Sequence, residues 1–516
     1  MAKRIKNQHP MSTAQQLGSI IKFCRDIMRK DKGLNGDLDR LPMLTWVMFL
    51  KFLDDMEMIR AEEMSLAGKR YKPVIEAPYR WRDWAAKEDG ITGDDLIAFI
   101  NNDEAKGPDG KRGAGLFAYL RSLQGANGGD RRDVIATVFR GLNNRMLNGY
   151  LLRDILNKVS GIHFNSSDEI HTIGYLYESM LKEMRDSAGD SGEFYTPRAV
   201  IKFMVKVLNP RLGETVLDPA CGTGGFLVET FEHLKGQCKR TEDFRKLQEE
   251  SLTGIEAKSL PYLLSQMNLM LHGLEYPQID PGNALRFPLN EIGDRERVDI
   301  VLTNPPFGGE EEKGIQNNFP DDKRTAETAL LFLQLIMRKL RRPVGGKKPG
   351  RCGIVVPNGT LFGDGVCARI KEELLKDYNL HTIVRLPNGV FAPYTSIPTN
   401  LLFFDRSGPT KDIWYYEQPL PEGRKSYTKT KPMQFEEFED CIKWWNKRKE
   451  KERAWKVKTS DVTANNFNLD IKNPSGKEDY EHQPPEKLVE DIIAKEQRIL
   501  EIMAEIRQVL AEGVKA

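Results

Sequence analysis

Short apolar runs alternate with helical patterns along residues 165 to 418 of this 516-residue chain. Helical patterns over 259–271, 325–341 and 364–377 separate several of these runs. This alternation predicts an α/β domain whose mostly parallel, doubly wound sheet carries helices on both faces, with ligands beyond the carboxyl ends of its strands. The predicted strands are Thr215–Asp218, Leu252–Glu256, Val298–Thr303, Cys352–Pro357, His381–Leu386, Asn400–Asp405 and Ile413–Glu417.

The segments on either side of this alternating region have different residue patterns. Residues 1–165 are expected to form a helical N-terminal domain, residues 166–475 the domain that contains the sheet, and residues 476–516 a C-terminal helix. A repeating apolar stripe in that last segment is a modest coiled-coil signal, although an amphipathic helix packed on its own domain would show the same pattern. The stripe consists of Leu488, Ile492, Ile499, Ile502, Ile506 and Val509.

Composition excludes several classes of protein. Hydrophobic residues make up 40% of the chain and charged residues 29%, as in a soluble globular protein, and no apolar run reaches membrane-spanning length. Six cysteines without paired spacing and seven scattered histidines predict a reduced, cytoplasmic protein without a metal site. Because the net charge is only +2, binding of nucleic acid would depend on local basic patches, for which Arg338–Arg351 is a candidate.

A glycine-rich turn follows the first predicted strand. Leu227 stands where a dinucleotide fingerprint has its third glycine, and the sequence contains no ATP-binding P-loop, so the turn predicts a smaller nucleoside ligand.

Two further polar residues are expected to contact this nucleoside. Glu256, at the end of the next strand, would accept hydrogen bonds from the ribose hydroxyls, and Asn283 is placed to reach an adenine ring. Glu256 also matches half of an E-x-K nuclease site, but no suitably spaced Pro-Asp precedes it. The residues of the turn that we expect to contact the ligand are Asp218, Ala220, Gly222, Thr223, Gly224 and Gly225.

A second motif, Asn304-Pro305-Pro306-Phe307, ends the strand predicted over Val298–Thr303. The prolines hold a stiff, extended turn, so the Asn304 side-chain oxygen and the Pro305 carbonyl can accept both hydrogens of one exocyclic amino group. Such a nitrogen is a poor nucleophile because its lone pair is conjugated with the ring, and these hydrogen bonds free the lone pair for attack on a methyl sulfonium. Phe307 offers a stacking face for a base taken out of the helix. A simple strand-terminating turn would explain the prolines but not the full set, so we predict that these four residues are catalytic.

The combination of D-P-A-C-G-T-G-G-F-L with N-P-P-F resembles amino-group DNA methyltransferases. Gly192-Glu193-Phe194-Tyr195-Thr196-Pro197-Arg198 is similar to that family's upstream cofactor motif. Two later stretches, Leu386–Thr395 and Phe467–Pro474, together with the helical N-terminal region, resemble the modification (M) subunit of type I restriction-modification systems. The resemblance spans the chain from about Leu17 to Pro474.

This resemblance implies a function and a set of partners. The cofactor would be S-adenosyl-L-methionine, with its methionine part covered by Glu193, Phe194, Tyr195, Thr196, Pro197 and Arg198. The product would be N6-methyladenine within a bipartite site of double-stranded DNA, which protects host DNA and is required also for restriction. A specificity (S) subunit would supply target recognition to two M subunits and dock on residues 476–516, and a restriction (R) subunit would complete the complex. Phe391 and Tyr394 are candidates for a further wall of the adenine pocket.

Three alternatives stay open at the level of sequence. Cytosine-N4 methylation is the nearest chemistry, and motif spacing alone does not exclude it. A protein-glutamine methyltransferase would also use N-P-P before an aromatic residue, because an amide nitrogen poses the same chemical problem. A non-catalytic scaffold is the third alternative, and the intact motifs argue against it.

Overall fold

The computed structural model describes the N-terminal and catalytic parts of the chain and a small part of its C-terminus. The described residues are 13–66, 68–125, 131–162, 196–346, 348–392, 395, 397–428, 430–475, 493, 495–497, 499–504 and 506. They fall into two compact units, Met1–Ile471 and Lys472–Ala516. Among the described residues, no helix is long and apolar enough to cross a membrane.

The N-terminal region is helical, as predicted, with one small hairpin that the sequence analysis did not anticipate. Its apolar run from Leu44 to Leu53 is almost wholly buried and belongs to a core that most of these helices share. The elements, in chain order, are α1 (Thr13–Met28), α2 (Asp37–Leu66), α3 (Trp81–Trp84), α4 (Gly93–Asn101), β1 (Glu104–Lys106), β2 (Arg112–Ala114), α5 (Leu116–Ser122), α6 (Arg131–Arg140) and α7 (Gly149–Ser160).

A nine-stranded sheet follows, and its strand directions confirm the prediction of a mostly parallel sheet. Only β9 and β11 run antiparallel to their neighbours. In spatial order the strands are β11 (Ala454–Lys458), β10 (Asp412–Glu417), β8 (Asn379–Arg385), β9 (Thr399–Asp405), β7 (Arg351–Pro357), β6 (Ile300–Thr303), β3 (Val216–Asp218), β4 (Leu252–Ile255) and β5 (Gln278–Asp280).

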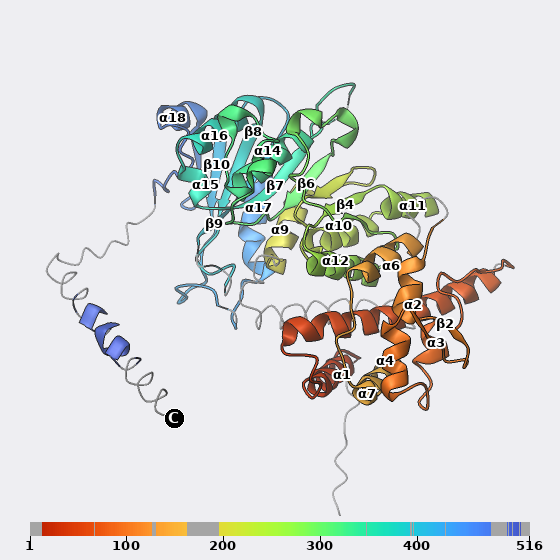
Figure 1. Cartoon of the computed structure of the whole chain (residues 1–516). Helices are drawn as coiled ribbons and strands as arrows, with labels where there is room; N and C mark the ends of the chain where they lie inside the picture. The colour runs from red at the N-terminus through yellow and green to blue at the C-terminus, as the bar shows by residue number, and fades with distance from the viewer. Residues whose placement is uncertain are drawn as a thin grey trace, which may run out of the picture. The chain divides into compact units, whose positions relative to one another are not determined.

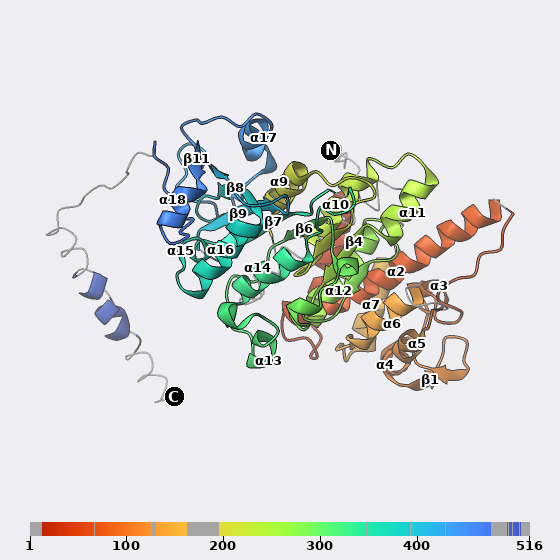
Figure 2. The ribbon, with the colours of Figure 1, turned by 90° about the horizontal axis from the view of Figure 1, so that it is seen from above.

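Helices cover both faces of this sheet, so successive residues of a strand enter different cores. Val216 and Ile300 pack with α9 and α10, whereas Leu217 and Val301 pack with α14. Figure 2 shows α9 and α17 on one side of the strands and α14 and α16 on the other. The helices of this region are α9 (Arg198–Leu208), α10 (Gly225–Lys235), α11 (Thr241–Glu249), α12 (Ser259–Leu271), α13 (Lys313–Gln316), α14 (Thr328–Lys339), α15 (Gly359–Phe362), α16 (Val366–Asp377), α17 (Glu439–Asn446) and α18 (Thr459–Ala464).

Helix α12 joins the sheet to the N-terminal helices. Every residue from Pro261 to Leu271 is buried, including the polar Ser265, Gln266 and Asn268, so the helix is enclosed on all sides. Tyr262 and Leu269 belong to the core of the sheet, while Leu263 and Met267 belong to the core of the N-terminal region. Contacts with α2 cover its outer side (Figure 1).

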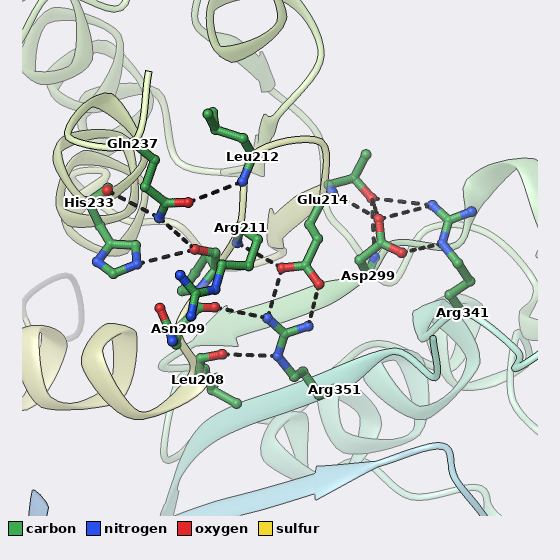
Figure 3. Close-up of polar contacts among 12 residues, drawn as sticks. Leu208, Asn209, Arg211, Leu212, Glu214, His233, Gln237, Asp299, Arg341 and Arg351 are labelled. Carbon is green, nitrogen blue, oxygen red and sulfur yellow. Dashed lines mark hydrogen bonds and ion pairs between the residues drawn. The ribbon is translucent and has the colours of Figure 1, made fainter. Parts of the chain in front are cut away.

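The basic stretch Arg338–Arg351 lies at the amino edge of the sheet, where it is tied into ion pairs. Arg341 pairs with Asp299 at 2.5 Å, and Arg351 forms a bidentate pair with Glu214 at 2.7 and 2.8 Å (Figure 3). Arg338 pairs with Glu373 at 2.8 Å. The glycine turn and N-P-P-F follow the opposite, carboxyl ends of their strands. Three arginines of this stretch are thus engaged in ion pairs within the protein, and the suggestion that the stretch contacts DNA stays a prediction.

The described residues between 493 and 506 are helical, and their apolar side chains face solvent within their own unit. Ile499, Ile502 and Ile506 of the predicted stripe are 58%, 41% and 52% exposed. The other stripe residues, Leu488, Ile492 and Val509, lie outside the described residues.

Candidate active site

The candidate site forms where the chain reverses its direction of travel through the sheet. From β3 the chain adds β4 and β5 on one side, and then returns to add β6 and β7 on the other. Ligands in doubly wound sheets bind at such a switch point. A hydrogen bond links the two central strands there, because the Thr303 hydroxyl donates to Asp218 Oδ1 at 2.7 Å. The two motifs found in the sequence therefore begin on adjacent strands.

Asp218 is 1% exposed, so its carboxyl lies beneath the glycine turn. The backbone N–H of Ala220 also donates to it, at 3.2 Å. Burial raises the pKa of Asp218 to about 7, although the Thr303 and Ala220 hydrogen bonds oppose that rise. We predicted Asp218 as a ligand-contacting residue, and the structure places it where it shapes the turn from below.

The turn itself is built around left-handed glycines and Glu256. Gly222 and Gly224 have φ angles of 53° and 79°, which side chains with a Cβ rarely adopt. The Gly222 N–H donates to Glu256 Oε2 at 2.9 Å, and the Lys258 N–H donates to Oε1 at 2.8 Å. Burial raises the pKa of Glu256, and these two backbone hydrogen bonds oppose the shift. Each carboxylate oxygen retains a lone pair for a further donor.

The next loop toward the sheet edge contains Asn283, which we predicted to reach an adenine ring. Its Oδ1 accepts a hydrogen bond from the Leu285 N–H at 2.9 Å, and its Nδ2 approaches Glu311 at 3.4 Å. Its side chain thus holds the loop that follows β5. The loop is tied to the Glu256 turn as well, because the Glu256 N–H donates to the Asp280 carbonyl at 2.9 Å.

On the other side of the switch point, Asn304 has one amide atom paired and one unpaired. Its Nδ2 donates to the Thr196 hydroxyl at 3.0 Å. Its Oδ1 is buried and has no hydrogen-bond partner among the residues that the structure describes. Thr196 thus fixes the amide so that its acceptor oxygen is available. Leaving a buried acceptor unpaired costs about 1–3 kcal/mol, so a ligand that donates there gains correspondingly.

The described part of the upstream motif contacts both halves of the site. Thr196 orients Asn304, while the Arg198 guanidinium donates to the Gly225 carbonyl at 3.1 Å, at the start of α10. Pro197 is the N-cap residue of α9. Glu193, Phe194 and Tyr195 lie outside the described residues.

The aromatic residue of N-P-P-F contacts a residue that we proposed as a second wall. The Phe307 and Phe391 rings meet edge to face, with centroids 5.4 Å apart. Phe307 is half-buried, whereas Phe391 is 4% exposed and belongs to the core. Phe391 therefore supports Phe307 from behind. Tyr394 lies outside the described residues.

Sequence reasoning missed Thr303 and did not foresee the contact between Thr196 and Asn304. A threonine that ends an otherwise aliphatic strand was the available signal for Thr303. No local signal connects Thr196 with Asn304, because 108 positions separate them. Among the described residues, no cluster of three or more His, Cys, Asp or Glu side chains could hold a metal ion.

A sheet that places a D-P-A-C-G-T-G-G turn and an N-P-P-F turn on adjacent strands at its switch point defines an amino-group methyltransferase. Comparisons with known proteins agree. Residues 168–483 match the family of N-6 DNA methylases, and residues 17–159 match the HsdM N-terminal domain. The methylase subunit of the type I restriction enzyme EcoEI from Escherichia coli is 47% identical over 96% of this chain and 98% of that protein.

Two solved structures are similar over most of their length. A protein from Vibrio vulnificus YJ016, described as a modification subunit of a type I restriction enzyme, is 70% identical with a TM-score of 0.86, covering 92% of this chain and all of that one. A chain from a structural study of assembly and conformational transition in the type I R-M system is 39% identical with a TM-score of 0.76, covering 98% and 99%. This chain belongs to the N-6 DNA methylase family, as a methylase subunit of type I restriction enzymes. The resemblance and the fold expected from the sequence are thus confirmed.

The buried carboxyl of Asp218 predicts a pH dependence of stability. Because its folded pKa of about 7 lies above the ordinary 3.8, the folded protein retains a proton that the unfolded chain releases between these values. This contribution to the free energy of unfolding is complete below the lower value and is lost as the pH rises through the upper one. Asp218→Asn keeps the oxygen that accepts from Thr303 and Ala220 but does not ionise. Urea unfolding across this range should show a shallower decline for the variant, and identical slopes would contradict the assignment.

Proposed function

We propose that this chain transfers a methyl group from S-adenosyl-L-methionine to the N6 atom of adenine in a bipartite DNA sequence. The observation that carries the proposal is the buried, unpaired Oδ1 of Asn304, which the Thr196 contact leaves available. An adenine amino group is a donor that would satisfy this oxygen. The fold and the family agree with this chemistry.

The residues around the glycine turn suit the proposed cofactor. Gly222 and Gly224 have no side chain to block close approach, and the two Glu256 oxygens can each accept one ribose hydroxyl while keeping their backbone partners. The turn also leads into the N-terminus of α10, which favours a carboxylate. When bound, S-adenosyl-L-methionine supplies an electrophilic methyl group.

The chain's own residues would activate the amino group by position. Asn304 Oδ1 would accept one of its hydrogens and the Pro305 carbonyl the other, with no competing N–H from the prolines. These bonds localise the nitrogen lone pair toward the methyl donor. Phe307, braced by Phe391, would stack on a base that has left the DNA helix. Such extrusion is needed because the amino group is inaccessible inside a duplex.

We expect Asn304→Ala to remove methylation while cofactor binding persists, because the residues assigned to the cofactor belong to other segments of the chain. Losing one preorganised group in such a site costs about 3 kcal/mol in the barrier, or roughly a hundredfold in kcat. Thr196→Val should lower kcat less, since it frees the amide without removing it, and Thr196→Ser should restore the rate. The measurement is transfer of labelled methyl to DNA, with calorimetry as the control. Near-normal turnover of the Asn304 variant would refute its role.

Cofactor affinity should depend on Glu256 and Gly222 for different reasons. Glu256→Ala removes the ribose acceptors and should weaken binding about tenfold, as expected for the loss of a hydrogen bond to a charged group. Gly222→Val forces a β-branched residue into a left-handed conformation and should crowd the turn. Isothermal calorimetry with S-adenosyl-L-methionine measures both effects. Unchanged affinity in both variants would exclude this pocket.

The proposal extends to partners. As a type I methylase subunit, this chain is expected to act with a specificity (S) subunit in a ratio of two to one, and with a restriction (R) subunit in the full complex, so that methylation protects host DNA and supports restriction. The exposed Ile499, Ile502 and Ile506 form an apolar stripe that helices of the S subunit would cover. We assign residues 476–516 to this docking role and residues 1–165 to further contacts with partners or DNA.

Deleting residues 480–516 should therefore leave cofactor binding intact and weaken assembly with the S subunit. All residues that we assign to the cofactor lie in the other compact unit, which the deletion does not enter. Co-elution of the two proteins and calorimetry of the truncated chain test both halves of this expectation. A truncated chain that assembles fully and methylates its site normally would rule out the docking role.

A further inference from the structure

A pocket of about 460 Å³ lies at the carboxyl edge of the sheet, away from the glycine turn. Its walls come from the ends of β7, β8 and β10 and from the start of β9, through Asn358, Leu386, Gln418 and Asn400. In the sheet these strands lie on the far side of β6 from β3, β4 and β5. The residues assigned to the cofactor follow β3, β4 and β5 or belong to residues 193–198, and none of them lines this pocket.

Both stretches that mark the chain as an M subunit contribute to this pocket. Residues 386–388 line it, and the same loop continues to Phe391, which contacts Phe307. Arg385 also lines it, and its guanidinium is held by Asp470 and, at 2.9 Å, by the Ile471 carbonyl. The stretch around Asp470 thus fixes one wall, and the loop after β8 joins the pocket to the catalytic aromatic residue.

The lining combines flat apolar surface with amide groups. Gln418 is 3% exposed, and its Nε2 donates to the Glu437 carbonyl at 2.7 Å. Its Oε1 is buried and, within the described part of the chain, has no hydrogen-bond partner.

The Asn400 amide donates to Asn358 Oδ1 at 3.0 Å, which leaves further donor and acceptor positions on both side chains. Amides match the donor and acceptor edges of nucleobases, and Pro387 and Leu420 offer the apolar contact that a base face requires.

Charge distinguishes the interior of the pocket from its rim. Inside, Arg385 is neutralised by Asp470, and Glu417 adds a second carboxylate near the same guanidinium. At the rim, Arg453 is exposed. The interior therefore has no excess positive charge to hold a phosphate, which suits an uncharged base, whereas an exposed guanidinium at the rim suits a phosphate.

The position of the pocket sets how far its occupant lies from the reacting adenine. Asn358 follows β7, the strand next to β6, and neighbouring strands are about 4.8 Å apart. The pocket therefore begins about one strand spacing from Asn304 and extends across the ends of three further strands. The far end of the pocket is thus about four strand spacings from β6, and because a stacked DNA strand rises about 3.4 Å per nucleotide, the pocket lies within about six nucleotides of the target.

We propose that this pocket receives a nucleotide of the methylated strand close to the target adenine, with amides such as Gln418 and Asn388 on its base and Arg453 on its phosphate. This inference rests on the proposed function, since it assumes DNA at the carboxyl edge. It gives the M subunit a DNA contact of its own, besides the base that it methylates and apart from recognition by the S subunit.

The test combines abasic substitutions with variants of two exposed pocket residues, Asn388 and Arg453. The complete complex of this chain with its S subunit is titrated with its recognition duplex, after the methylated motif has been read from modified DNA. Each nucleotide within about six positions of the adenine is replaced by an abasic residue, one at a time. At the position that fills the pocket, affinity should fall about tenfold for the unmodified chain, and the Asn388→Ala/Arg453→Ala variant should show no such penalty.

Matched controls separate this outcome from others. Arg211→Ala removes one exposed arginine at the amino edge and should keep the full abasic penalty. Positions read by the S subunit should show equal penalties with and without the pocket variant. The inference is overturned if every abasic penalty persists in the pocket variant, or if that variant loses the S subunit on gel filtration, which would mark a protein-docking site. Failure of the proposed function has a different signature, because then the unmodified complex would form no N6-methyladenine in any duplex.

Discussion

The hydrogen bond between Thr303 and Asp218 fixes the position of the two halves of the site relative to each other. It joins the end of β6 to the end of β3 at the switch point, so the glycine turn and N-P-P-F cannot move independently. Burial makes this link strong, because water cannot compete for the Asp218 carboxyl. Methyl transfer needs donor and acceptor atoms aligned within fractions of an ångström, and a short polar link between adjacent strands is a direct way to fix that separation.

A second link reinforces the first from outside the sheet. The start of α9 contacts Asn304 through Thr196 and the start of α10 through Arg198. The upstream motif thereby orients the Asn304 amide through Thr196, while the N-P-P-F turn sets the position of its backbone. This arrangement explains how a motif far upstream in sequence bears on Asn304, since one short segment contacts both halves of the site.

Much of the fold could be predicted, because the strands of a sheet buried on both faces are continuous apolar runs. Two strands of the nine-stranded sheet lack such an apolar run and were not predicted. Strand β5 has three residues between polar and proline-rich turns, and β11 is an edge strand whose five residues include the exposed Lys456 and Lys458. In the site, the sequence predicted which residues gather at the switch point. It could not predict that Asn283 is engaged within its own loop, or that Phe391 is core, because such contacts depend on how distant segments pack.

The N-terminal region bears on the site through the same kind of packing. Helix α12 places apolar residues in both cores, so the N-terminal helices are needed to cover the side that faces away from the sheet. Directly after α12, Glu275 accepts Arg60 at 2.7 Å and Arg131 as well, and Arg131 also lies over the Tyr276 ring. Five residues after Glu275 the chain reaches Asp280, whose carbonyl accepts a hydrogen bond from the Glu256 N–H. Two arginines of the N-terminal region therefore anchor the segment that supports the proposed cofactor wall, which makes that region part of the catalytic framework.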